Sequence, residues 1–340
     1  MADKKLLGIA ILVIAVIAAI GAVAVFYAPA PTEEKPVQIS VMMGFVPLVI
    51  WSPFYTALDK GFYADEGLNV TIQYTTEGSM GAIKQVAAGK VEFGYGGGDA
   101  IIIARSKGIP VVMIYQTEQK QPFRIIAKKK TGIKEPKDLI GKKVATPGFG
   151  SSAYIVDRII LYKAGVDYKK VEFVATGGGA RLNAFLNDNV DASDFHITHE
   201  VILRRRNESI NIIYASNYTN VPAIGLFTSE DMINKHPDIV RKFVRATRRG
   251  LIYAINHPEE AVDIFIKFQP EAAKDRDLQL AIWKAYSKEI LLTDTEIPRG
   301  GCNYTQWEEA QDVLYEIGMI DKKTDITKAC TDEFVRNLIK

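Results

Sequence analysis

Residues 91–115, with the sequence VEFGYGGGDAIIIARSKGIPVVMIY, contain a strand, a glycine-rich turn, a helix and a second strand. Residues 91–95 and 111–115 have the β-branched and aromatic composition that is typical of strands. Between them, residues 100–107 favour a helix that ends at Gly108. Because a helix that joins two neighbouring strands makes them parallel, this stretch predicts a mostly parallel sheet flanked by helices.

The same alternation extends over the chain from residue 37 onward. Further strands are predicted at 37–41, 68–74, 123–127, 142–146, 171–175, 192–195, 210–214 and 223–227. Helices are predicted at 53–61, 80–88, 151–164, 180–186, 198–206, 237–256, 258–268, 278–288 and 307–317. The expected fold class is therefore α/β.

The alternation restarts near Arg124, and after Pro222 a single strand is followed by long helices. We interpret this as a first lobe at 37–121 that leaves for a second lobe at 122–220 and returns at 221–340. The length of 340 residues agrees with two packing units. Two chain crossings between lobes make a hinge, and small-molecule sites commonly lie in the cleft between lobes.

The N-terminus predicts an extracytoplasmic protein held at the cell membrane. Two lysines precede an uncharged run over 6–28, which is about the 20 residues that a helix needs to cross a bilayer. A cleaved signal peptide has a shorter apolar region, although the small residues at 22–24 leave cleavage open. The lysines should stay in the cytoplasm, so we expect an anchor or signal segment at 1–28, a spacer at 29–36 and a soluble domain outside.

Composition limits the partners and the cysteine chemistry. The formal net charge of +2 argues against a nucleic-acid partner. Cys302 and Cys330 fit no metal-ligand spacing. Outside the cytoplasm these two cysteines can form one disulfide, and two unpaired buried thiols are the alternative.

Four glycine-rich turns each follow a predicted strand and precede a predicted helix, at 76–79, 96–99, 147–152 and 176–179. In open α/β sheets, ligands bind beyond the carboxyl ends of strands, and free N–H groups at helix starts favour an anionic or polar ligand group. Asp99 is therefore a candidate acceptor of a ligand hydrogen bond, and Ser151 and Ser152 are candidates for binding an acidic or carbonyl group. All three also suit helix N-caps. The turns lack phosphate-loop and dinucleotide spacings, and we expect no cofactor.

Several segments between residues 37 and 267 share a pattern with one family. They are PFYTALDKGFY at 53–63 followed by EGL at 66–68, AGKVEFG at 88–94, ARSKGIPVV at 104–112, GIK at 132–134 with PKDLIGKKV at 136–144, FVRAT at 243–247 and HPEEA at 257–261. Together they resemble type II periplasmic binding proteins, in the branch that serves aliphatic sulfonates, taurine, nitrate and the thiamine pyrimidine precursor. The resemblance implies the two-lobed type II fold. It also implies an extracytoplasmic, monomeric substrate-binding protein whose partners are a small solute and the permease and ATPase subunits of an ABC importer.

The first loop departs from the family pattern. The binders of the thiamine precursor usually carry an Asp-Trp dipeptide and a downstream His there, and the matching positions here are Gly44, Phe45 and Trp51. Phe45 and Trp51 can stack on a planar or apolar ligand, or pack within the lobe. The apolar loop favours an aromatic or hydrophobic solute over nitrate or taurine. Related pyrimidine-synthesising enzymes use a cysteine-rich motif that this sequence lacks, so we expect a protein that is not an enzyme.

The resemblance also implies ligand contacts outside the first loop. Gln119 and Gln121 lie near the first crossing, where the family often has a hinge glutamine. The segment DFHITHE at 194–200 follows a strand of the second lobe and faces the cleft in the family. The ligand contacts that this implies are His196, Thr198 and Glu200.

Two other functions stay open at the level of sequence. An enzyme of the pyrimidine-synthesis type or a metal-dependent hydrolase would draw its support from His196 and His199, which together with a carboxylate could hold zinc. The spacing is not that of a His-Glu-x-x-His metalloprotease. A tethered ligand sensor would need a signalling output, and we expect none from this chain.

Overall fold

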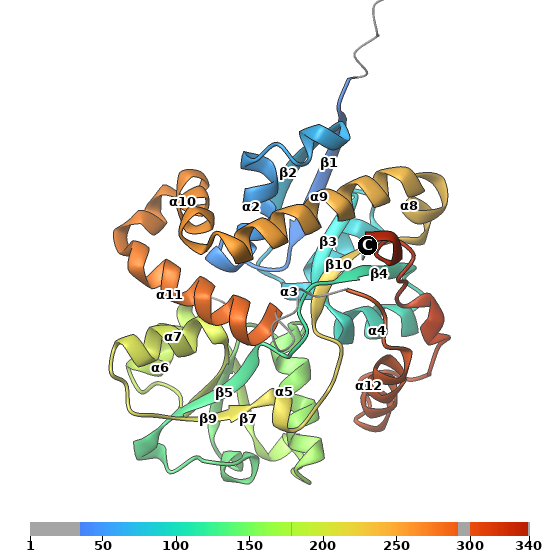
Figure 1. The fold of residues 1–340 in the computed structure, drawn as a ribbon. Helices are drawn as coiled ribbons and strands as arrows, with labels where there is room; N and C mark the ends of the chain where they lie inside the picture. Colours follow the sequence, from blue (N-terminus) through green and yellow to red (C-terminus); the bar gives the residue numbers. More distant parts are fainter. Residues whose placement is uncertain (1–34, 178, 292–299, 339–340) are drawn as a thin grey trace, which may run out of the picture. The chain divides into compact units, whose positions relative to one another are not determined.

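The computed structural model describes residues 35–177, 179–291 and 300–338. The predicted anchor at 1–28 lies outside these residues. Within the described ranges, no helix is long and apolar enough to cross a membrane. From residue 37 onward the chain builds two five-stranded sheets with helices around them, which confirms the predicted α/β class (Figure 1).

The first sheet has the strand order β2-β1-β3-β10-β4. Its strands are β1 (Val37–Met43), β2 (Leu68–Tyr74), β3 (Phe93–Gly97), β4 (Val111–Gln116) and β10 (Ile224–Ser229). β1 runs parallel to β2 and β3, whereas β10 runs antiparallel to β3 and β4. Close packing requires glycine at position 94 in β3, because a Cβ there would collide with the ring of Phe227 on β10.

The second sheet repeats this arrangement with the order β7-β6-β8-β5-β9. Its strands are β5 (Phe123–Lys128), β6 (Lys143–Thr146), β7 (Glu172–Ala175), β8 (Ala192–His196) and β9 (Ile210–Tyr214). β6 runs parallel to β7 and β8, and β5 runs antiparallel to β8 and β9. In each sheet one antiparallel strand is therefore inserted into an otherwise parallel set.

The chain passes between the sheets twice, once between β4 and β5 and once between β9 and β10. The lobe boundaries predicted at 121/122 and 220/221 fall in these two connections and stay a prediction. Gln121 joins the two connections, because its side-chain amide donates a hydrogen bond to the carbonyl of Val221 at 2.9 Å.

Helices pack on both faces of each sheet. They are α2 (Ser52–Asp59), α3 (Gly78–Ala87), α4 (Gly98–Ser106), α5 (Ser152–Lys163), α6 (Ala180–Leu186), α7 (Ile197–Arg205), α8 (Glu230–Lys235), α9 (Pro237–Asn256), α10 (Pro258–Phe268), α11 (Arg276–Tyr286) and α12 (Tyr304–Glu316). One core of the first sheet holds side chains of α2, α9, α10 and α11, and the other holds those of α3, α4 and α12. In the second sheet, α5 covers one face, and α6 and α7 cover the other.

Helix α11 connects the two halves of the fold. It packs against α10, which covers the first sheet, and against α7, which covers the second (Figure 1). Trp283 of α11 is fully buried and its indole N–H donates a hydrogen bond to the carbonyl of Ala254 at 2.9 Å. This bond holds α11 to α9, which covers the first sheet.

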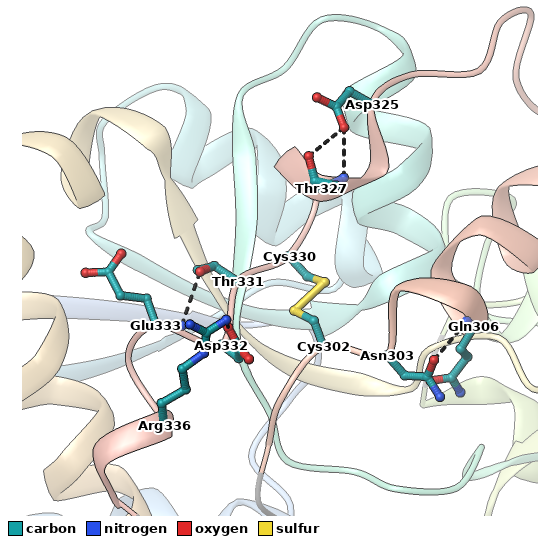
Figure 2. The surroundings of a disulfide bond; sticks show 10 residues. All are labelled: Cys302, Asn303, Gln306, Asp325, Thr327, Cys330, Thr331, Asp332, Glu333 and Arg336. Atoms are coloured by element: carbon teal, nitrogen blue, oxygen red, sulfur yellow. Dashed lines mark hydrogen bonds and ion pairs between the residues drawn. A yellow bond between two sulfur atoms is a disulfide. The ribbon is translucent and has the colours of Figure 1, made fainter.

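The two cysteines form a disulfide, which decides between the two alternatives drawn from the sequence (Figure 2). The Cα atoms of Cys302 and Cys330 lie 6.0 Å apart across a sequence separation of 28 residues. Cys330 lies in a short segment that pairs with β4, where the amide of Met113 donates to the carbonyl of Ala329 at 2.9 Å. The bond thus fastens the start of α12 to the edge of the first sheet.

Some element boundaries differ from the predictions. β3 extends through Gly96 and Gly97, which the sequence assigns to a turn, because these glycines pair with Gly225 and Ile224 on β10. The predicted helix at 278–288 begins earlier, at Arg276, and its last turn is a π-helix over Ser287–Leu291. The helix α8 was not predicted from the sequence.

Candidate functional site

A cavity lies where the carboxyl ends of β1, β3, β6 and β8 approach one another. Its enclosed volume is about 90 Å³, and the whole hollow, including the part that is open to solvent, measures about 700 Å³. The predicted residues that line it are Phe45, Trp51, Ser151, Ser152, His196 and Thr198. The other lining residues are Gly44, Leu48, Ile50, Gly78, Ser79, Tyr95, Gly96, Phe123, Pro147, Ala153, Arg181, His199 and Ile224.

Aromatic side chains of both sheets form the apolar walls. Trp51 is 4% exposed, and its ring meets that of Tyr95 edge to face, with 5.3 Å between centroids and an angle of 83°. Its indole N–H donates to the carbonyl of Val46 at 3.0 Å, which fixes the side chain in the core where it lines the cavity. Phe45 is half-buried and Phe123 comes from the start of β5, so each can lie against a planar ligand.

A chain of hydrogen-bonded polar side chains leads from the lining residues Ser79 and Ser152 to the buried Asp99. The hydroxyl of Ser152 donates to Oδ1 of Asp99 at 2.9 Å, and the oxygens of Ser152 and Ser79 lie 3.0 Å apart. The amide of Gly97 donates to Oγ of Ser79 at 3.1 Å. Asp99 is 1% exposed and does not line the cavity, although the sequence predicts it as a direct contact. Burial raises the pKa of Asp99 to about 6.

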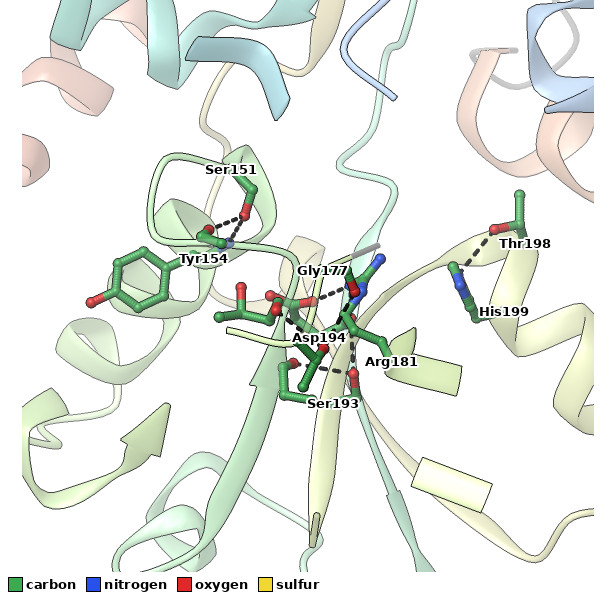
Figure 3. Close-up of polar contacts among 12 residues, drawn as sticks. Ser151, Tyr154, Gly177, Arg181, Ser193, Asp194, Thr198 and His199 are labelled. Carbon is green, nitrogen blue, oxygen red and sulfur yellow. Dashed lines mark hydrogen bonds and ion pairs between the residues drawn. The ribbon is translucent and has the colours of Figure 1, made fainter. Parts of the chain in front are cut away.

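Ser151 caps helix α5. Its hydroxyl oxygen accepts a hydrogen bond from the amide of Tyr154 at 3.3 Å, and its hydroxyl hydrogen goes to the carbonyl of Gly148 at 2.7 Å (Figure 3). The N-cap role that the sequence suggests is thus present, while the side chain also reaches the cavity wall.

His196 is neutral, and among the described residues one of its ring nitrogens has no hydrogen-bond partner. Its Nδ1 accepts a hydrogen bond from the amide of Thr198 at 3.3 Å and so caps α7. Burial, together with the charge of Arg124, holds the pKa of His196 well below its usual range. Since Nδ1 accepts, the hydrogen of the neutral ring is on Nε2, which has no hydrogen-bond partner among the described residues. The side chain is 8% exposed and lines the cavity.

His199 does not combine with His196 in a metal site. Its Nδ1 lies 3.2 Å from the hydroxyl of Thr198, and its ring stacks on Phe195 with 4.5 Å between centroids. Burial lowers the pKa of His199 to about 3. In the described part of the chain, no group of three or more His, Cys, Asp or Glu residues is arranged to hold a metal ion.

Arg181 is a lining residue that the sequence analysis missed. It follows the glycine-rich turn at 176–179, lies in the first turn of α6, and is 4% exposed. Its guanidinium donates to the carbonyl and the carboxylate of Asp194 on β8 (Figure 3). The buried carboxyl of Asp157 lies near this pair, and burial raises the pKa of Asp157 well above its usual range. An arginine directly after a predicted turn was a signal that could have been used.

Two further predicted residues have other partners and do not line the cavity. The side chain of Gln119 donates to the carbonyl of Gln116 at 3.3 Å, within the first connection between the sheets. Glu200 accepts hydrogen bonds from Arg204 at 2.7 Å and from Arg124, and it contacts the hydroxyl of Tyr214 at 3.3 Å. Its carboxylate is therefore compensated by two guanidinium groups.

Comparison with known proteins agrees with this architecture. The chain is 30% identical over 319 residues to a riboflavin-binding protein of Chloroflexus aurantiacus. This alignment covers 91% of this chain and 89% of that protein. It is 26% identical over 289 residues to a formylaminopyrimidine-binding protein of Halalkalibacterium halodurans, with 82% and 85% covered. A 4-amino-5-hydroxymethyl-2-methylpyrimidine phosphate synthase of Legionella pneumophila is 23% identical over 88% of this chain and 92% of the enzyme.

Among solved structures, the alkanesulfonate-binding protein SsuA from Xanthomonas axonopodis pv. citri superposes with a TM-score of 0.69. It is 14% identical and covers 88% of this chain and 99% of its own, so the likeness concerns the fold. The sequence resemblance to the sulfonate- and pyrimidine-binding branch of binding proteins is thus confirmed. The NMT1/THI5-like family model matches residues 51–261, and the chain belongs to this family.

Proposed function

We propose that this protein is the extracytoplasmic substrate-binding component of an ABC importer and that it captures a neutral, planar heteroaromatic solute such as a flavin or a pyrimidine. The observation that carries this proposal is the cavity between the two sheets, which is lined by Phe45 and Trp51 from the segment after β1 and by Phe123 from the start of β5. Flat aromatic walls recognise a flat ring through stacking and burial of apolar surface. The names of the relatives that bind riboflavin and formylaminopyrimidine support this ligand class.

The size of the cavity requires movement of the sheets. Sites for ligands of this kind usually measure about 300–1,000 Å³, and the enclosed space of about 90 Å³ is smaller. We propose that the connections between β4 and β5 and between β9 and β10 act as the hinge, that the two sheets correspond to two lobes, and that the lobes open to admit the solute. Helix α11, which packs on both halves of the fold, would have to shift against α7.

The test is titration of the full-length protein, purified in detergent, with riboflavin, 4-amino-5-hydroxymethyl-2-methylpyrimidine, formylaminopyrimidine and hexanesulfonate. We expect saturable one-to-one binding of a flavin or pyrimidine, and quenching of riboflavin fluorescence by the aromatic walls. If hexanesulfonate binds and none of the ring compounds does, the proposed ligand class is wrong.

Import is tested separately from binding. Reconstituted permease and ATPase subunits should hydrolyse ATP faster when the loaded protein is added, and unloaded protein should stimulate less. A reporter fused after residue 36 should be active outside the cytoplasm if the anchor has the predicted orientation. Conversion of a pyrimidine probe into a new compound by the purified protein would instead support the enzymatic alternative, which the synthase-named relative keeps open.

A further inference from the structure

The direction of the hydroxyl hydrogens in the cavity wall follows from counting protons. A serine hydroxyl has one hydrogen to donate. Ser152 gives its hydrogen to the carboxylate of Asp99 at 2.9 Å, so it cannot also donate to Ser79. The bond of 3.0 Å between the two serine oxygens must then be donated by Ser79. Each hydroxyl oxygen keeps an acceptor position, and both hydrogens are used inside the protein.

The third serine of the wall is used in the same way. Ser151 donates its hydrogen to the carbonyl of Gly148 at 2.7 Å. The serine hydroxyls that line the cavity, those of Ser79, Ser151 and Ser152, therefore all donate their hydrogens to acceptors within the protein. The arrangement depends on close packing, because a Cβ at Gly97 would collide with Oδ1 of Asp99 and Oγ of Ser152.

We propose that Asp99 determines ligand specificity: by orienting the Ser79 and Ser152 hydroxyls, it makes this wall an acceptor surface that selects a ligand N–H group and discriminates against oxyanions. This inference deepens the proposed function and rests on the cavity being the binding site. The sequence alone favours the opposite for Ser152, namely an acidic or carbonyl group.

Another lining residue, His196, supports a neutral ligand with both donors and acceptors. His196 Nε2–H is a buried donor with no partner among the described residues, so it can bind a ligand carbonyl. Of the cavity-lining residues that the structure describes, Arg181 carries the formal positive charge, and it is paired with Asp194. Among the described lining residues, a buried sulfonate would meet the acceptor oxygens of the serines and no cation without a carboxylate partner, which is unfavourable. An imide or amide edge offers both an N–H for the serine oxygens and a C=O for His196 Nε2–H.

Asp99 is suited to this role at neutral pH. Burial raises its pKa to about 6, so the carboxylate form predominates near pH 7 and accepts the Ser152 hydrogen. The side chain has no direct access to the cavity, so it acts as a positioning residue through Ser152.

The binding experiment uses riboflavin and 3-methylriboflavin, which differ at one N–H group, together with hexanesulfonate. For the full-length wild type we expect methylation to weaken binding by about tenfold or more, since a buried acceptor is left without a donor. The amide introduced by Asp99→Asn can donate to Ser152 and so reverse the direction of the hydrogen bonds between these side chains. The variant should therefore bind riboflavin about tenfold more weakly and show a smaller difference in affinity between the two flavins. Hexanesulfonate should bind more tightly to this variant than to the wild type.

Two further variants separate specificity from folding. Ser152→Ala removes the acceptor without adding bulk and should also abolish the discrimination between the flavins. Ser106→Ala, at a buried serine of α4 that donates to the carbonyl of Ile103 at 2.8 Å and does not line the cavity, is the control and should retain the discrimination. Equal affinity of the wild type for both flavins, or unchanged discrimination in Ser152→Ala, overturns the role of Asp99 and leaves the proposed function standing. Failure of the wild type to bind riboflavin, 4-amino-5-hydroxymethyl-2-methylpyrimidine and formylaminopyrimidine overturns the proposed function itself.

A ligand-independent measurement tests the same claim. Neutron diffraction from crystals of the deuterated protein near neutral pH locates the hydroxyl deuterium of Ser152. We expect it on the line from Ser152 Oγ to Asp99 Oδ1. A deuterium that points into the cavity contradicts the proposal whatever the ligand is.

Discussion

We predict that Glu118, in the connection between β4 and β5, makes the stability of the folded protein depend on pH. Its carboxyl is fully buried, and the hydroxyl of Tyr286 donates to Oε1 at 2.6 Å. Oε2 has no hydrogen-bond partner among the described residues. Burial raises the pKa of Glu118 to about 8 from the ordinary 4.5. At pH 7 this carboxyl is therefore mostly protonated in the folded protein and ionised in the unfolded chain.

An acid with a higher pKa in the folded state binds more protons when folded, so its contribution to stability is present at low pH and is lost as the pH rises. For Glu118 the loss extends from pH 4.5 to about 8 and amounts to on the order of 5 kcal/mol. Glu118→Gln keeps the acceptor for Tyr286 and cannot ionise. We therefore expect this variant to be more stable than the wild type at about pH 9 and to depend less on pH.

Urea unfolding followed by tryptophan fluorescence at about pH 5, 7 and 9 measures this difference. The exposed Glu308→Gln is the matched control and should retain the pH dependence of the wild type. If Glu118→Gln and the wild type lose the same free energy of unfolding over this range, the assignment of a buried neutral carboxyl in the first connection between the sheets is refuted.

Three other changes test separate parts of the structure. Replacing Cys302 and Cys330 by Ala opens a loop of 28 residues and should lower the free energy of unfolding by about 3–4 kcal/mol in urea titrations, and reductant should have no further effect on this variant. Phe45→Ala should weaken riboflavin binding by about 1–3 kcal/mol in fluorescence titrations, whereas exposed Phe149→Ala should not. Gly94→Ala should reduce stability by about 1–3 kcal/mol through its clash with Phe227, and Gly148→Ala, with open space around it, is the control; equal melting temperatures would contradict this.

Much of the fold was accessible from the sequence because local patterns determine it. Each strand of the two sheets overlaps a strand predicted from a β-branched or aromatic run. The errors lie where tertiary contacts override local preference. Gly96 and Gly97 favour a turn by composition, yet pairing with β10 keeps them in the ladder of β3. β10 is distant in sequence, so this pairing could not be predicted from the local segment.

The site was predicted less completely, since roles within a cavity depend on neighbours far apart in the chain. Phe45 and Ser152 line the cavity, so their predicted ligand contacts stay predictions, while Asp99 lies behind Ser152 as the next member of a hydrogen-bonded chain. Glu200 was expected to face a ligand, and two arginines compensate it instead. Arg181 was missed because its importance arises from its contact with Asp194 on β8, outside its own helix α6.

The central claim is that the cavity between the sheets binds a neutral planar ring. Calorimetric titration of the full-length protein with riboflavin tests it most directly, with Phe45→Ala measured in parallel. The account predicts saturable one-to-one binding of riboflavin that weakens in the variant. Saturable binding of hexanesulfonate together with no heat from riboflavin or the two pyrimidine probes would contradict it.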